Sequence, residues 1–183
     1  MAVAYRASSR VGDTSGTSLA LPAPTGTTTD DIVVAYLHLT GGATPSISGG
    51  NGTWTKITTQ QSEGGGYYAT AWWKRTTSAD SGNYSITWSG TLTGEADAIT
   101  LSGVSSSVVD PIESAAWAAI NADLIFPDMS LASKDTDPAL LLFASTTAAG
   151  TKAYPTSYTE VQDNSRLTSA AYRLPGAAGT YQT

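Results

Sequence analysis

Hydrophobic and polar residues alternate along this chain in short runs that turn-forming residues separate. The run NYSITWS alternates strictly, so Tyr84, Ile86 and Trp88 are expected on one face of a strand. The run DIVVAYLHL is almost continuously apolar, which is typical of a central strand covered on both faces. Glycine and proline clusters between such runs indicate tight turns. The first half of the chain is therefore predicted to form strands at residues 2–8, 18–21, 31–39, 54–60, 67–76, 83–89 and 95–104.

A second set of strand-like runs follows a break at Val109, Asp110 and Pro111. The run ESAAWAAI within it could instead form a short helix, because alanine favours helices. The strands predicted in this set are residues 114–120, 124–126, 139–146, 158–162 and 167–174.

The two sets of runs resemble each other in order. Each has a short apolar strand, a proline, a polar link, an acidic residue and then a buried strand. We therefore expect an all-β, jelly-roll-like antiparallel β-sandwich over residues 1–183, with pseudo-repeated halves at about 1–108 and 111–183. The alternative is two tandem immunoglobulin-like units that meet near Val109 and Asp110. The matched residues are Trp54 with Tyr158, Trp73 with Tyr172, Lys74 with Arg173, and Tyr84 with Tyr181.

The second half stops soon after its match to Tyr84, whereas the first half continues through Trp88 into a further strand. We expect the last strands of the second half to be missing from this chain or to be supplied by a partner. An open sheet edge at this place would invite pairing with another chain.

Composition refines the expected fold and its surroundings. The 22 Ser and 28 Thr are typical of a disordered chain, but 5 Trp, 9 Tyr and 40% hydrophobic residues indicate a packed core. Charged residues make up only 13% and the net charge is −6, which argues against a nucleic-acid-binding surface. A polar surface with few long charged side chains is ordered against a neighbour at little entropic cost, which suits a symmetric assembly.

Candidate chemistry is sparse. The chain has no Cys and a single His, which excludes disulfides and both thiolate and multi-histidine metal sites. His38 shares a strand face with Val34 and Tyr36, so we expect a packed histidine rather than a catalytic base. The sequence contains no phosphate loop, nucleophile elbow or calcium loop. We therefore predict no catalytic, cofactor-binding or metal-binding residue, and no cofactor.

Carboxylates are the remaining groups that a glycoside hydrolase could use, since that chemistry needs two of them across a cleft. Most lie at predicted strand ends or turns, where aspartate is expected for local hydrogen bonding. Glu95 and Asp97 share one strand face and could equally be solvated. The candidates are Asp30, Asp31, Glu63, Glu95, Asp97, Asp110 and Glu113.

The adjacent Trp72 and Trp73 must point to opposite faces of a strand. The match of Trp73 to Tyr172 favours Trp73 as the inward residue, which leaves Trp72 on the outer face with Tyr68. Exposed flat rings stack on sugars, so Tyr68 and Trp72 are a candidate interaction site or glycan platform. The alternative is that a loop or a neighbouring subunit covers both rings.

Four segments together resemble a family of phage and bacterial surface β-sandwich proteins that is found in phage tails and heads. They are the opening AYRASSRVGDTSGTSLALPAPTGTTTDDIVVAYLHLTGG, then GTWTKI, AWWKRTTSADSGNYSITWSG and AITLSGVSSSVVDPIESA, within residues 4–175. The family closes with further strands that this chain lacks. The residues that carry the resemblance are Asp31, Trp54, Trp73, Lys74, Tyr84, Trp88, Ser102, Gly103, Val104, Asp110 and Pro111.

The resemblance implies a non-enzymatic structural protein of a bacteriophage virion, either a head decoration or minor capsid protein or a tail or fibre component. Its partners would be other virion proteins and itself, because closed symmetry makes a homo-oligomer the usual state of such parts. The acidic charge and the lack of a long apolar run argue against nucleic acid and membrane as partners. The first residues do not form a signal peptide, so we expect synthesis in the host cytoplasm and localisation in the virion. The alternative function is a carbohydrate-binding host-attachment module whose partner is a host cell-surface glycan.

Overall fold

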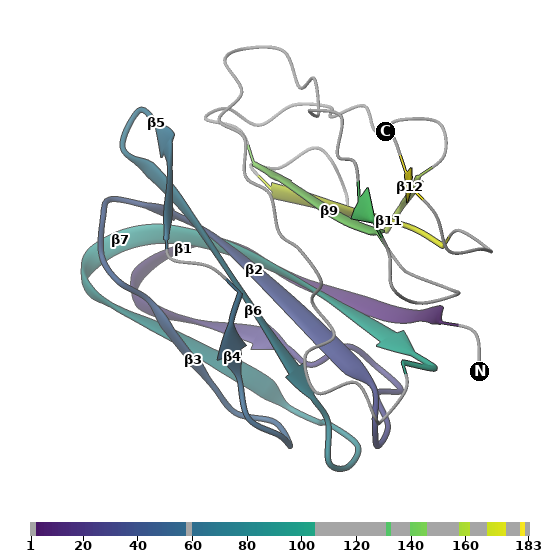
Figure 1. Ribbon diagram of the computed structural model, residues 1–183. Helices are drawn as coiled ribbons and strands as arrows, with labels where there is room; N and C mark the ends of the chain where they lie inside the picture. Colours follow the sequence, from purple (N-terminus) through teal and green to yellow (C-terminus); the bar gives the residue numbers. More distant parts are fainter. Residues whose placement is uncertain are drawn as a thin grey trace.

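The computed structural model describes residues 3–57, 60–104, 131–132, 140–145, 158–161, 168–174 and 180–181. These residues form strands and no helix, so the predicted all-β class is confirmed. None of them belongs to a helix long and apolar enough to cross a membrane. A large antiparallel sheet packs against a second, smaller sheet (Figure 1). The large sheet contains β1 (Ala4–Pro22), β2 (Ile32–Thr40), β3 (Ser46–Ser48), β4 (Thr55–Lys56), β5 (Gln61–Gly64), β6 (Tyr67–Arg75) and β7 (Asn83–Ser102).

Two long strands, β1 and β7, form the frame of the large sheet. They pair antiparallel from Ala4 opposite Ser102 to Pro22 opposite Asn83. Their register shifts beyond Gly16, and extra residues of one strand bend such a pair. In Figure 1 both strands curve back at one end of the sheet. The main path of the sheet runs β1-β7-β2-β6-β4, with β3 paired to β7 and β5 paired to β6.

This frame differs from the separate strands that the sequence predicts. Of the strands predicted at residues 2–8 and 18–21, the parts 4–8 and 18–21 belong to one strand, β1, and residues 83–89 and 95–102 belong to another, β7. The glycines between the predicted strands are typical of turns, but here Gly16 and Gly94 lie inside paired strands near a bend. The short strands β3 and β5 were not predicted.

The bent sheet encloses a hydrophobic core between its own halves. The start of β7 contributes the predicted face of Tyr84, Ile86 and Trp88, all of which are buried. The opposing wall comes from the alternate residues of β2 and β6. Burial of so many aliphatic and aromatic side chains is the main force that holds the bend closed. The core residues are Leu19, Leu21, Val33, Ala35, Leu37, Leu39, Trp72, Tyr84, Ile86, Trp88, Ala96 and Ala98.

The second sheet covers the other face of β2 and β7. It is ordered β10-β11-β9, from β9 (Leu140–Ser145), β10 (Thr159–Glu160) and β11 (Thr168–Arg173). The ring of Tyr36 stacks on Phe143 with centroids 5.2 Å apart, and Tyr5 stacks on Tyr172 at 4.6 Å. The prediction that residues 31–39 are covered on both faces is therefore confirmed. A separate pair of strands is formed by β8 (Leu131–Ala132) and β12 (Thr180–Tyr181).

The pairing within the small sheet matches part of the large one. β6 lies between β4 and β2, and β11 lies between β10 and β9. Trp73 pairs with Val34 and Thr55, and Tyr172 pairs with Leu141 and Thr159. The expected boundary near Val109 and the alternative helix at residues 113–120 lie outside the described residues.

Candidate functional site

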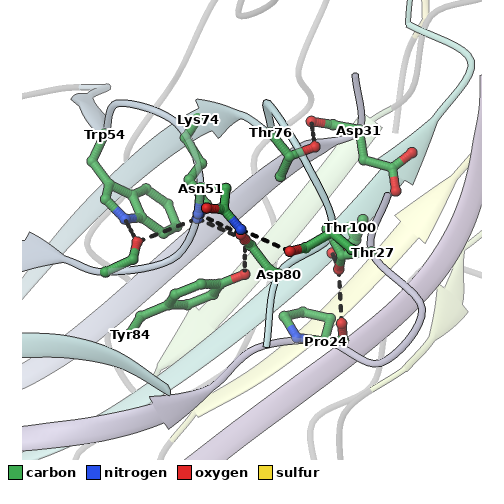
Figure 2. A network of polar contacts seen from close by, with 12 residues as sticks. Pro24, Thr27, Asp31, Asn51, Trp54, Lys74, Thr76, Asp80, Tyr84 and Thr100 are labelled. Atoms are coloured by element: carbon green, nitrogen blue, oxygen red, sulfur yellow. Dashed lines mark hydrogen bonds and ion pairs between the residues drawn. The ribbon is translucent and has the colours of Figure 1, made fainter. Parts of the chain in front are cut away.

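A buried lysine–aspartate pair lies where the connection between β6 and β7 meets the loop before β4. Lys74 is near the end of β6, and Asp80 is in the connection that follows. Lys74 Nζ is 2.6 Å from Asp80 Oδ2, and both side chains are 0% exposed (Figure 2). Tyr84, at the start of β7, donates a hydrogen bond from its hydroxyl to the same Oδ2 atom over 2.7 Å. Burial of two charged groups is expensive, so these contacts must replace the water that the groups lose.

Two aromatic rings enclose the amino group of Lys74. Its Nζ atom lies 4.4 Å from the ring centroid of Tyr84 and 4.8 Å from that of Trp54. The two rings meet edge to face, with centroids 5.0 Å apart. Figure 2 shows Lys74 reaching between them from β6. Ring faces attract a cation, and these rings also exclude water from it.

The loop of residues 49–52 (GGNG) closes the site. The carbonyl oxygen of Gly49 accepts hydrogen bonds from Trp54 Nε1 at 3.0 Å and from Lys74 Nζ at 3.3 Å. The backbone N–H of Asn51 donates to Asp80 Oδ1 at 2.5 Å. A Cβ atom on Gly50 would overlap Lys74 Nζ and lie 2.8 Å from Cε1 of the Tyr84 ring, and the φ of Gly50 is +69°. Glycine is therefore required at position 50 both by its conformation and by the space that the lysine occupies.

Burial sets the protonation behaviour of this site. It lowers the pKa of Lys74 below its ordinary value, because the charged amine is penalised more than Asp80 favours it. Burial also raises the pKa of Tyr84, and the hydrogen bond to Asp80 raises it further. Tyr84 is consequently a hydroxyl donor at every ordinary pH, while Lys74 gives up its proton more readily than an exposed lysine.

A second polar cluster joins the two sheets. Glu95 Oε2 accepts a hydrogen bond from the backbone N–H of Thr168 at 2.9 Å, and Arg10 Nη2 lies 3.5 Å from the same oxygen. Arg10 also donates to the Thr168 hydroxyl at 3.0 Å, and its Nε atom lies 3.6 Å from Asp97 Oδ1. Glu95 and Asp97 are both buried. Of the alternatives left open for these carboxylates, exposure to solvent is therefore wrong.

The other groups considered from the sequence lie apart from the lysine site. His38 is buried and stacks on Tyr67 with ring centroids 5.1 Å apart, which confirms a packed histidine. Asp31 is buried and pairs with Arg6, its Oδ2 lying 2.7 Å from Arg6 Nε. Asp30 is exposed with a φ of +67°, and Glu63 lies in β5. The remaining two carboxylates, Asp110 and Glu113, fall outside the described residues.

The rings of Tyr68 and Trp72 do not form an exposed platform. Trp72 is 3% exposed and packs in the core of the bent sheet, with Lys56 Nζ 5.7 Å from its ring centroid. Trp73, expected inward, is only partly buried on the opposite face, and Tyr68 is partly buried too. The outward assignment of Trp72 is therefore wrong, because the bend of the sheet creates a core on that face. Trp72 is covered by strand residues of its own bent sheet, which differs from both alternatives considered, a loop and a neighbouring subunit.

Sequence reasoning missed the lysine site because Asp80 has the character of an ordinary turn residue. Trp54, Lys74 and Tyr84 were noted for their motifs, but nothing in their spacing predicts that they meet. The usable signal is the glycine-rich run at residues 49–52 followed closely by Trp54.

Among the residues that the structure describes, no group of three or more His, Asp or Glu side chains is arranged to hold a metal ion. No protein-family model matches this sequence, and searches among curated proteins and solved structures find no significant similarity either.

Proposed function

We propose that this chain is a non-enzymatic structural protein of a bacteriophage virion, placed either in the head as a decoration or minor capsid protein or in the tail and its fibres. The observation that supports this proposal is that residues which carry the sequence resemblance are buried and hold the fold together. Asp31, Lys74, Tyr84 and Trp88 are all buried and bonded to other parts of the chain. These residues stabilise the β-sandwich from inside. The resemblance therefore rests on residues with a structural role, as expected of a structural protein.

The buried polar clusters support the same proposal. An enzyme must present its reactive groups in a pocket that a substrate can enter. Lys74 and Asp80 are closed off from solvent, and Glu95 is bonded to the backbone of the second sheet. Within the described part of the chain these groups join strands to one another.

The proposal is tested by quantitative mass spectrometry on density-purified phage particles that encode the chain. We expect it in the particles at a fixed ratio to the major capsid protein. Copies on the order of hundreds would assign it to the head, and fewer, up to some tens, would assign it to the tail or fibres, because copy number follows the symmetry of the assembly. A phage replication protein, absent from intact particles, is the negative control. Absence of the chain from the particles would contradict the proposal.

The alternative function, a carbohydrate-binding host-attachment module, loses the site first considered for it. Trp72 is covered by its own chain and cannot stack on a sugar in this structure. A glycan-binding role would follow if the purified chain bound host polysaccharide in titration calorimetry, whether or not it were found in particles.

A further inference from the structure

We propose that Lys74 and Asp80 become joined by an intramolecular amide bond between Nζ and the side-chain carboxyl carbon of Asp80. The ion pair described above is the reactant of this reaction. The inference concerns the isolated chain and does not depend on the proposed function.

The first requirement is an amine and a carboxyl group held together without water. Lys74 Nζ is already 2.6 Å from Asp80 Oδ2, and neither side chain is exposed. Trp54 and Tyr84 cover the amine, and the loop of residues 49–52 covers it from the other side. Two groups fixed in contact react with a large effective concentration, and a dry site removes the water that would reverse the reaction.

The second requirement is a neutral amine, since only the unprotonated nitrogen is a nucleophile. Burial works toward this state by lowering the pKa of Lys74. The ammonium can transfer a proton directly to Asp80 Oδ2 along their short contact, which gives a free amine beside a carboxylic acid.

The third requirement is stabilisation of the carboxyl group while it reacts. The backbone N–H of Asn51 points at Oδ1, where negative charge develops when the carbon becomes tetrahedral. The hydroxyl of Tyr84 points at Oδ2, the oxygen that leaves. Each carboxyl oxygen thus has its own donor, and the donor on the leaving oxygen has a raised pKa and stays protonated.

The reaction balances with no other reagent. The Nζ–Cγ bond forms and the Cγ–Oδ2 bond breaks. Oδ2 leaves as water, with one proton from the carboxylic acid and one from the amine. The product is one amide and one water molecule, so the chain loses about 18 Da. The bond ties the end of β6 to its connection with β7, under the loop of residues 49–52.

The test is tryptic mapping of the folded, purified full chain after denaturation. Cleavage at Arg75 leaves residues 57–75 and 76–134 on separate peptides unless the amide joins them. We expect one branched peptide, about 18 Da lighter than the two parts together, with no cleavage after Lys74. These peptides exclude Met1, so processing of the N-terminus does not affect the result. Recovery of residues 57–74 as an ordinary peptide of full mass would overturn the proposal.

Variants assign the bond to its two residues. K74M is expected to remove the branched peptide. K56M, the same substitution at the lysine over Trp72, is expected to retain the branch, now between residues 11–75 and 76–134 because the cleavage after position 56 is lost. D80N should lose ammonia, about 17 Da, and give a product identical in mass to that of the unmodified sequence. Different product masses for these two chains would overturn the assignment to the side-chain carbon of residue 80.

Refolding kinetics test the role of Tyr84. Y84F keeps the ring against Lys74 but removes the hydrogen-bond donor to Oδ2. The rate is followed on chain that has stayed unfolded since synthesis, as in inclusion bodies, because an amide already formed would survive denaturation. On refolding of this material the branched peptide of Y84F should accumulate at least about tenfold more slowly, since loss of one donor to a reacting oxygen usually costs more than this. An unchanged rate would overturn the role of Tyr84 as a hydrogen-bond donor to the leaving oxygen.

Discussion

Burial and neighbouring charge act in opposite directions on the pKa of the Lys74 amino group. Removal from water favours the neutral amine, while Asp80 and two ring faces favour the cation. The hydrogen bonds from Asn51 and Tyr84 to Asp80 make the arrangement specific, because each carboxyl oxygen receives its own donor. Such a site tolerates little change, since a buried charge left without its partner costs about 3–5 kcal/mol.

Gly50 should therefore be among the least replaceable residues of the chain. G50A places a methyl group where Lys74 Nζ lies, so we expect a loss of at least about 3 kcal/mol in the free energy of unfolding. G26A is the matched control, because Gly26 also has a positive φ, +78°, but open space around it. It should cost about 1 kcal/mol from backbone strain alone. Urea unfolding measures both, and equal losses would show that contact with the lysine is unimportant.

The pKa of Tyr84 predicts a stability change at alkaline pH. In the unfolded chain this hydroxyl ionises near its ordinary pKa of 10.0, whereas in the fold it keeps its proton. Its contribution is intact below pH 10 and declines above that value by about 1.4 kcal/mol per pH unit. Y84F lacks the titrating group, so the stability advantage of the unmodified chain over Y84F should shrink above pH 10. Urea unfolding from about pH 8 to about pH 11 tests this, and a constant difference would contradict it.

At the scale of the elements, the two sheets are joined by apolar stacking and by the second polar cluster, which consists of Arg10, Glu95 and Thr168. Tyr36 meets Phe143 and Tyr5 meets Tyr172, while Glu95 and Arg10 bind the first residue of β11. The polar contacts fix which residue of β11 lies over β7, because hydrogen bonds depend on direction and apolar contacts do not.

Removal of the second polar cluster should destabilise the small sheet more than the large one. E95A leaves Arg10 and the Thr168 N–H without their shared acceptor, so we expect a loss of about 3 kcal/mol. Amide hydrogen exchange should accelerate in β9 and β11 more than in β2 and β6, since local opening follows the weakened contact. T159A, at an exposed position on β10, is the control and should change stability by less than about 0.5 kcal/mol. Equally faster amide exchange in both sheets of E95A would show that the second polar cluster does not act locally.

The sequence predicts the strands better than it predicts which residues of different strands and loops come into contact. The alternation through Tyr84, Ile86 and Trp88 was sufficient to predict the buried face of β7, because apolar and polar residues strictly alternate there. The faces of Trp72 and Trp73 were not decidable in this way, since both rings are large and apolar and the core lies where the sheet bends. Asp80 became part of a site only through the approach of a loop distant in the sequence.

At the scale of the whole molecule, the stacked sheets share one extended interface through β2 and β7. β2 is buried on both sides, so loss of either layer exposes apolar surface of the strand that serves both. This arrangement favours a single folding unit over two independent ones.

Calorimetry distinguishes the single sandwich from two tandem immunoglobulin-like units. We expect one unfolding transition whose calorimetric and van't Hoff enthalpies agree, because the layers lose their contacts together. Two resolved transitions, or a calorimetric enthalpy well above the van't Hoff value, would favour the tandem arrangement.

The long pairing of β1 with β7 also determines the order of events during synthesis. Ala4 finds its partner only when Ser102 has been made, so β1, which is synthesised before the other strands of the large sheet, is completed by the last of them. Contacts so distant in the sequence carry a high loop-closure entropy and slow the folding of β-proteins. Until then β1 is an unpaired edge, and its glycines, serines and the charged Arg6 and Arg10 make it a poor template for pairing with a neighbouring chain.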